Sequence, residues 1–400
     1  MIAKHKILTI LPFVLLLVSS LYAYSSAGWN INEEGKLEMI GRVDFIKCGL
    51  DYFSLCIVLW LAYRSINRIH ISRELTLALP LLLFAVIFWI IMTIAEHGLM
   101  TMIYTPGSPL SYLAILAIYV GADEECWNII KRIAPIFASI YLTLATIPYL
   151  ELKVLGDFSN LAGNNPIIYF MTTSFWWASI SSIEISHKSI YYKLWIVLLI
   201  AIFAFLAFSM ALRSWLIQSV LLLMLVIWQF HSSKWLRIIF VVVLMAGVLW
   251  SAEQIVTSSE MQEEVDAFND KLTKDNRTHQ YEILFEEISL DQWILGGGMK
   301  ASYAINGEGN YKHIDNQYML LLFRYGILLA IPWISIWLLT LFKKRERDKK
   351  YIYDRSAVYV VVLWLMALGG LSVYNAVIVN PQNILLAMVA GRVLYQKVIS

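Results

Sequence analysis

A compact group of polar residues stands at positions 313–318, directly before a long apolar segment. His313, Asp315 and Asn316 place an imidazole, a carboxylate and an amide within four residues. This combination suits general-base chemistry, because histidine takes up a proton near neutral pH and a nearby carboxylate can also accept one. The alternative is structural, with Asp315 as the N-cap of the following helix and Asn316 as its first residue. Both roles can coexist in one segment.

Three arginines lie at or near the ends of apolar segments, where a charge requires a partner, a cavity or a ligand. Arg213 stands in a very short break between two apolar runs, Arg277 opens a helical segment of a polar loop, and Arg324 follows Asn316 by eight residues. Guanidinium groups bind phosphate in a bidentate manner, so Arg213 and Arg277 are candidate phosphate ligands. The alternatives are headgroup snorkelling for Arg213, a solvated or paired loop charge for Arg277, and an intramembrane ion pair or carbonyl anchor for Arg324.

The composition indicates that a membrane positions these residues. Of 400 residues, 59% are hydrophobic and 15% are charged, against roughly 25% charged in soluble proteins. Apolar runs of about 20 residues recur, each long enough to cross a hydrocarbon core of about 30 Å. We therefore expect an all-α, polytopic integral membrane bundle of about twelve transmembrane helices. The expected spans are 7–24, 45–63, 75–95, 108–121, 129–149, 166–185, 192–210, 214–231, 235–250, 315–342, 355–374 and 381–396.

The distribution of basic residues orients this bundle. Twenty of the 31 basic residues fall in alternate breaks, which places both termini in the cytoplasm. The same alternation assigns 251–313 to the outer side as one large periplasmic loop, with twelve acidic and five basic residues. Periodicity predicts short helices over 261–272 and 278–290, followed by an irregular glycine-containing stretch. The chain thus divides into 1–250 with helices 1–9, the loop 251–313, and 314–400 with helices 10–12.

Other motifs carry little chemistry. Residues 296–298, all glycine, lack the P-loop and Rossmann spacings, so we interpret this glycine loop as a tight or flexible turn. The separate placement of Cys48, Cys56 and Cys126 predicts no disulfide, and no spacing of ligating residues predicts a metal site. The net charge of +2, with basic residues scattered through short loops, argues against a nucleic-acid partner.

Taken in order and with their sidedness, these elements resemble the O-antigen polymerase and O-antigen ligase superfamily. The resemblance covers chiefly residues 209–330. It rests first on two arginines, Arg213 at a late hairpin apex and Arg277 in the one large outer loop. It also rests on a Leu-Gly turn, Leu295-Gly296-Gly297-Gly298, and on a polar segment, Asp315-Asn316-Gln317-Tyr318, that is followed by Gly326. It implies inverting glycosyl transfer from an undecaprenyl-diphosphate-linked oligosaccharide at the periplasmic face of the bacterial inner membrane, without metal or cofactor.

The resemblance also implies roles for individual residues. The diphosphate-binding residues would be Arg213 and Arg277, and the catalytic residues His313 and Asp315. Support would come from Asn316, Tyr318 and Arg324.

The choice between the polymerase and the ligase reaction depends on one departure from the family pattern. Ligases typically carry His directly before this Asn, whereas this chain has Asp315. The departure favours an O-antigen polymerase, which moves a growing chain onto the next lipid-linked repeat unit. A ligase that transfers glycan to lipid A-core is the alternative, and a flippase or transporter is a further one. Expected partners are the lipid-linked oligosaccharide, membrane lipid and a chain-length regulator.

Overall fold

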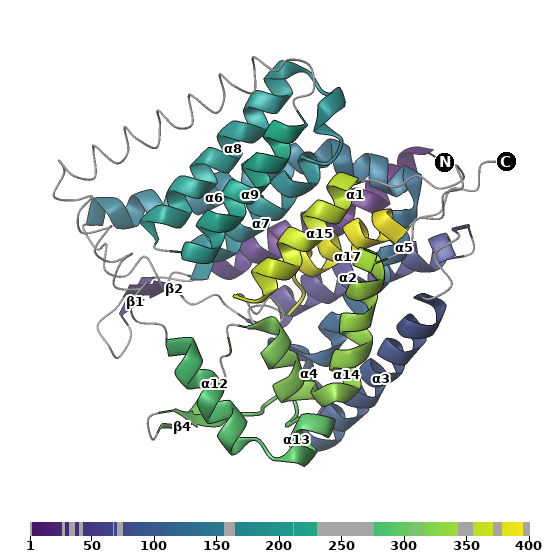
Figure 1. Cartoon of the computed structure of the whole chain (residues 1–400), viewed down its shortest axis with the longest axis vertical. Helices are drawn as coiled ribbons and strands as arrows, with labels where there is room; N and C mark the ends of the chain where they lie inside the picture. Colours follow the sequence, from purple (N-terminus) through teal and green to yellow (C-terminus); the bar gives the residue numbers. More distant parts are fainter. Residues whose placement is uncertain are drawn as a thin grey trace. The chain divides into compact units, whose positions relative to one another are not determined.

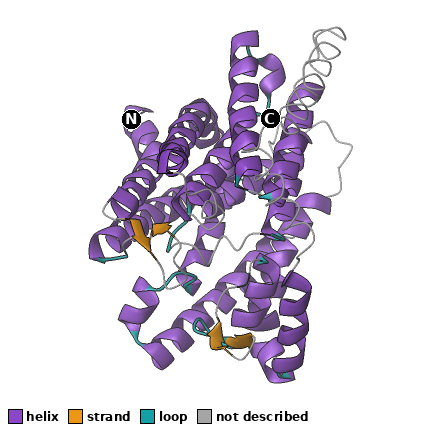
Figure 2. Cartoon of the chain, turned by 90° about the vertical axis from the view of Figure 1, so that its left-hand side faces the viewer, coloured by secondary structure: helices purple, strands orange, loops and turns teal. Residues whose placement is uncertain are grey.

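A computed structural model gives the fold, in which helices dominate and two small strand pairs are present (Figure 2). The chain divides into two units. Unit 1 comprises Met1–Ala27, Gly41–Ile133 and Arg277–Ser400, and unit 2 comprises Gly28–Ile40 and Ala134–Asn276. The structure describes residues 2–25, 29–31, 37–39, 43–66, 68–69, 75–155, 165–210, 212–229, 276–305, 308–311, 314, 316–342, 355–370 and 378–394.

Unit 1 contains helices from both ends of the chain. In chain order these are α1 (Ile2–Ser25), α2 (Phe45–Ile66), α3 (Leu75–His97), α4 (Leu99–Tyr104), η1 (Pro109–Leu116), α5 (Ala117–Ala122), α12 (Asn276–Glu287), α13 (Leu290–Leu295), α14 (Gln317–Phe342), α15 (Arg355–Leu368) and α17 (Pro381–Leu394). Helix α1 packs on α2, and α17 packs on α5 and α15. An antiparallel hairpin joins β3 (Tyr303–Ile305) to β4 (Glu308–Tyr311). In Figure 1, α12, α13 and β4 lie together beside α14 and α3.

Unit 2 is a smaller helical body. Helix α6 (Glu124–Leu155) crosses the division between the units. The other elements are α7 (Asn165–Ser181), η3 (Ile185–His187), α8 (Ile190–Ser209), α9 (Arg213–Trp228) and a hairpin of β1 (Trp29–Ile31) and β2 (Leu37–Met39). Near the start of α9, Trp215 lies edge-on to Phe175, Trp176 and Phe203 at centroid distances of 5.5, 5.5 and 5.9 Å. This aromatic cluster anchors the first turn of α9.

The helices confirm the predicted fold class. Six described helices are long and apolar enough to cross a membrane: Lys6–Tyr24, Phe45–Ile66, Leu75–His97, Glu124–Glu151, Ile190–Ser209 and Gln317–Phe342. Shorter apolar helices cover Pro109–Ala122, Ser214–Trp228 and Arg355–Leu368. The protein is therefore an all-α, multi-pass membrane protein. The total of twelve spans stays a prediction, as does the division at 250 and 313, since the expected span 235–250 lies outside the described residues.

Three local predictions require correction. The predicted span 315–342 is not one continuous helix, because α14 has non-helical backbone at Gly326, with φ 64° and ψ −173°. The segment 278–290 is covered by α12 and the start of α13, which are separate helices. The stretch after Leu295 is not simply irregular, since it contains the β3–β4 hairpin. The predicted helix 261–272 lies outside the described residues.

A buried ion pair within α2 is hydrogen-bonded to α1 in unit 1. Lys47 Nζ lies 2.6 Å from Asp51 Oδ2, and the two side chains are 7% and 1% exposed. The hydroxyl of Ser19, from α1, donates to the other carboxylate oxygen of Asp51. A charge inside a membrane bundle is stable only when it is paired and hydrogen-bonded in this way. The group therefore fixes α1 against α2.

Candidate functional site

The structure describes some of the predicted site residues and not others. His313 and Asp315 lie outside the described residues. Arg213 is the first residue of α9, in unit 2, and Arg277 is the second residue of α12, in unit 1. The backbone of both arginines is described and their side chains are not. The position of Arg277 agrees with the prediction that it opens a helix, whereas Arg213, expected in the break between two spans, lies in the first turn of α9. The binding roles of both arginines stay predictions.

Asn316 is the N-cap of α14. Its Oδ1 accepts hydrogen bonds from the backbone N–H groups of Tyr318, at 2.9 Å, and Met319, at 3.2 Å. These are the second and third residues of a helix that begins at Gln317, and they are the amides that an N-cap side chain reaches. The structural alternative, in which Asp315 caps this helix and Asn316 is its first residue, is therefore wrong. The carboxylate of Asp315 is not needed for that cap.

The first turn of α14 is also fixed through its side chains. The Tyr318 hydroxyl donates to the carbonyl of Leu365, in α15, at 2.7 Å. Gln317 is fully buried, and its Nε2 donates to the hydroxyl of Tyr112, in η1, at 3.4 Å. These contacts show a structural role for Tyr318: it holds the polar start of α14 against the rest of unit 1.

The backbone break in α14 is joined to the glycine loop. The N–H groups of Gly297 and Gly298 donate to the carbonyls of Phe323, at 2.9 Å, and Arg324, at 2.8 Å. The next carbonyl, of Tyr325, accepts from the indole N–H of Trp89, in α3, at 3.0 Å. Thus all three carbonyls before the break accept hydrogen bonds from outside the helix, as buried polar backbone requires. The interpretation of the glycine loop as a structural turn is confirmed.

This junction requires glycine on both sides. Gly296 and Gly326 have φ values of 87° and 64°, a region that side-chain-bearing residues avoid. A Cβ on Gly296 would lie 2.7 Å from the nitrogen of Gly326, and a Cβ on Gly326 would lie 2.6 Å from the nitrogen of Gly296. The two backbones therefore pack directly against each other. We refer to Gly296–298 with residues 323–326 as the glycine junction.

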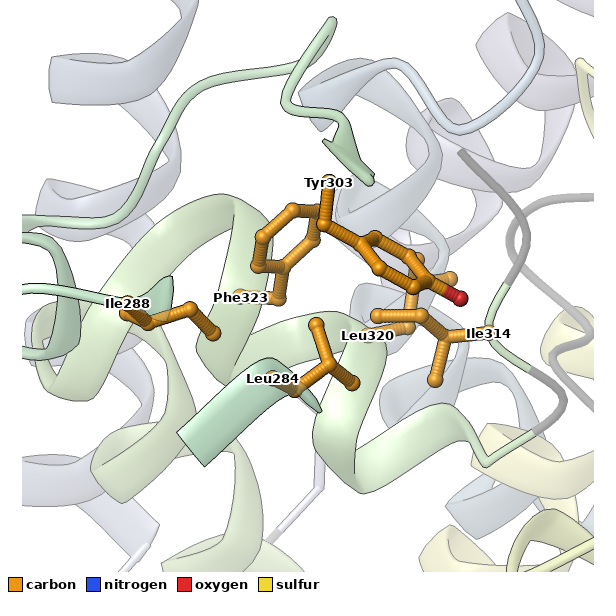
Figure 3. Close-up of a cluster of buried hydrophobic side chains, with 6 residues drawn as sticks. All are labelled: Leu284, Ile288, Tyr303, Ile314, Leu320 and Phe323. Carbon is orange, nitrogen blue, oxygen red and sulfur yellow. The ribbon is translucent and has the colours of Figure 1, made fainter. Parts of the chain in front are cut away.

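An apolar cluster extends this junction to α12 and the hairpin. Figure 3 shows its six buried side chains, Leu284, Ile288, Tyr303, Ile314, Leu320 and Phe323. The rings of Tyr303 and Phe323 meet edge to face with centroids 5.7 Å apart. Burial of each such side chain contributes roughly 1.5–3 kcal/mol. The cluster shows that apolar residues pack α12 and the hairpin against α14.

The cluster also anchors the segment that holds the two candidate bases. Ile314, which stands between His313 and Asp315 in the sequence, is fully buried in the cluster. Asn316 caps the helix directly after them. The candidate bases are thus flanked by two fixed residues.

Arg324 is a buried residue of the glycine junction. It is 4% exposed, and its carbonyl is the acceptor for Gly298. The roles predicted for Arg324, an intramembrane ion pair, a carbonyl anchor or a supporting site residue, stay predictions.

The sequence includes Gly326 in the motif of the resemblance, but the backbone break at this residue was not predicted, and neither were the contributions of Trp89 and Tyr303. The signal for Gly326 was a glycine inside a long apolar run, which often marks a break or a close backbone approach. Nothing in the sequence pairs Trp89 with residues more than 200 positions away.

Comparison with known proteins supports a family assignment. The family model described as O-antigen ligase matches residues 195–334. This range includes the start of α9, helices α12 and α13, the glycine loop, the hairpin and the broken part of α14. No curated protein and no solved structure matches the chain.

Proposed function

We propose that this chain is the polymerase of the O-antigen polymerase and ligase superfamily, an assignment that the family match over residues 195–334 supports. The family supports a glycosyltransferase-type enzyme of the bacterial membrane that acts on lipid-linked oligosaccharide. In the proposed reaction, the growing glycan leaves its undecaprenyl diphosphate and joins the non-reducing end of the next lipid-linked repeat unit. The reaction takes place at the periplasmic face, and both termini are cytoplasmic.

The chemistry is a single displacement with inversion. A hydroxyl oxygen of the acceptor sugar attacks the anomeric carbon of the donor glycan, and the bond from that carbon to the diphosphate oxygen breaks. The lipid diphosphate leaves with the electron pair, while the hydroxyl proton passes to His313 or Asp315. Arg213 and Arg277 each stabilise the negative charge that develops on the leaving group.

The observation that carries the proposal is the packing of the outer segments onto α14. The cluster joins α12, through Leu284, to Ile314 and Leu320. Arg277 opens α12, and the candidate bases flank Ile314. The helix that begins with a predicted phosphate ligand and the segment with the predicted base are therefore parts of one packed body. This arrangement supports a catalytic role for this part of the chain.

Asp315 supports polymerase over ligase, because ligases of the superfamily typically carry His at that place. Gene deletion distinguishes the two. Without a polymerase, the lipid A-core still receives a single repeat unit. Without a ligase, the core stays bare and lipid-linked polymer accumulates.

Arg213→Ala and Arg277→Ala should each abolish polymer, because the leaving diphosphate loses a bidentate cation. Arg→Lys at either position should restore only part of the activity. The measurement is the glycan ladder on a gel, with protein level and membrane insertion checked by immunoblot. The control is Arg64→Ala, which removes a guanidinium at the predicted cytoplasmic side, 5.0 Å from the Trp60 ring. Polymer of normal length in both arginine variants would sink the diphosphate-binding assignment.

Turnover by purified full-length protein tests the function itself. The substrate is a synthetic lipid-diphosphate-linked repeat unit, assayed with and without chelator. Polymer in both reactions supports an arginine-based glycosyltransferase, and no product overturns the proposal. The same assay on His313→Ala and Asp315→Asn identifies the base, and full activity in both would remove this segment from the chemistry.

A further inference from the structure

A cavity of about 300 Å³ lies beside the glycine junction. Its lining residues come from the link between α12 and α13, from α13 itself, from the glycine loop, from the start of the hairpin and from α14: Ile288, Gln292, Gly297, Lys300, Ala301, Ser302, Tyr303 and Phe323. Ligand pockets usually measure roughly 300–1,000 Å³. The volume therefore suits one small ring, and it is too small for an oligosaccharide.

The inner wall of this cavity is rigid. Ile288, Tyr303 and Phe323 are only 7%, 4% and 5% exposed, because they belong to the buried cluster. The carbonyl of Phe323 accepts a hydrogen bond from Gly297, which also lines the cavity. The cavity is thus built before a ligand arrives, and a preorganised site loses less entropy on binding.

The rim of the cavity is rich in hydrogen-bond donors. Lys300, Ser302 and Gln292 are exposed there and supply an ammonium, a hydroxyl and an amide. The Oε1 of Gln292 accepts from the backbone N–H of Ser289 at 3.2 Å, within a capping box at the start of α13. This contact leaves the amide NH₂ group as the end of Gln292 that can serve a ligand. The expected ligand therefore presents several oxygen atoms.

We propose that this cavity binds one sugar residue of the lipid-linked glycan. A sugar ring presents several hydroxyl oxygens, which match the donor-rich rim and the mainly polar lining of the cavity. Lys300, Ser302 and Gln292 are then residues that determine specificity, and they take no part in bond breaking. The identity of the glycan rests on the proposed function, whereas the chemistry of the cavity does not.

The kinetic test separates binding from chemistry. Lys300→Ala should raise KM for the lipid-linked repeat unit about tenfold or more, because a hydrogen bond from a charged donor is lost, while kcat stays unchanged. Lys300→Arg should recover part of the affinity. The matched control is Asp291→Asn, which alters an exposed residue of α13 that does not line the cavity. Wild-type KM in Lys300→Ala and in Ser302→Ala would overturn the inference and leave the polymerase proposal standing.

A binding test uses the free repeat-unit oligosaccharide, without lipid or diphosphate. Saturation-transfer NMR on the purified full-length protein should show contact in wild type and about tenfold weaker binding in Lys300→Ala. Inorganic diphosphate serves as the second probe. Displacement of the oligosaccharide by diphosphate in a Lys300-dependent manner would overturn the sugar assignment. Lys300-dependent sugar binding by a protein that makes no polymer would support the cavity and refute the polymerase proposal.

Discussion

Replacement of Gly326 by alanine should break the glycine junction. The backbone at Gly326 has φ 64° and ψ −173°, a conformation that is essentially restricted to glycine. The added Cβ would also lie 2.6 Å from the nitrogen of Gly296 and 2.7 Å from the carbonyl carbon of Ile294. Both neighbours are backbone atoms, which cannot rotate away as a side chain can. The variant must therefore separate α14 from the glycine loop.

Backbone strain and steric overlap together determine how much Gly326→Ala lowers the free energy of unfolding. Backbone strain at such a position costs about 1–3 kcal/mol, and insertion of a methyl group into packed surroundings costs a further ~1–3 kcal/mol. Three other glycines separate these contributions. Alanine at position 98 would be strained in the same way, because φ is 81° there, but its Cβ would overlap nothing. A Cβ on Gly121 would overlap the backbone of Met388 at a position without positive φ, and Gly49 has neither strain nor overlap.

Thermal unfolding of the detergent-purified protein, followed by tryptophan fluorescence, measures the result. Gly326→Ala should lower the Tm much more than Gly98→Ala does. Gly49→Ala should have a Tm equal to or slightly higher than that of wild type, because alanine favours the helix. Limited proteolysis should show faster cleavage between residues 296 and 302 in Gly326→Ala. A Tm and a cleavage rate equal to those of Gly49→Ala would refute the reasoning that the two backbones are in direct contact.

Two further predictions concern single polar residues that stabilise membrane helices. Asn316→Ala should lower the free energy of unfolding by about 1 kcal/mol, because two N–H groups of α14 lose their acceptor. Asn316→Asp should keep wild-type stability, and an equal loss in both variants would contradict the capping role. Asp51→Ala should destabilise by about 3–5 kcal/mol, because Lys47 stays buried without its carboxylate. The double variant Lys47→Met, Asp51→Leu should recover most of that loss in the same Tm assay, and a double variant as unstable as the single one would refute this explanation.

The membrane class and the resemblance to the family that matches residues 195–334 could be predicted from the sequence because both depend on local patterns. Apolar runs of about 20 residues report spans directly. Arg277 stands at the start of its helix as predicted. Arg213, expected in the break before the span 214–231, is the first residue of α9.

The junction at Gly326 could not be predicted in the same way. Hydropathy measures which residues enter the membrane, and it does not detect a backbone break inside a continuous apolar run. The break is stable only because the glycine loop and Trp89 supply donors from distant parts of the chain.

The choice of N-cap illustrates the same limit. Aspartate and asparagine cap helices about equally well, so residue type cannot decide between Asp315 and Asn316. Burial of Ile314 in the apolar cluster sets where the chain enters α14, and that burial depends on side chains from α12 and the hairpin.

Helix α17 has a consequence for the order in which the protein inserts. All 14 of its residues are buried, including Asn383 and Arg392. Its described part is about 21 Å long, less than a bilayer core of about 30 Å, and an arginine within a lone membrane helix is costly unless protein surrounds or pairs it. Gly391 packs against the backbone of Ile118, in α5. Only glycine permits so close an approach of the two helices. This helix therefore does not partition into lipid alone, and its docking completes the bundle after the preceding helices are in place.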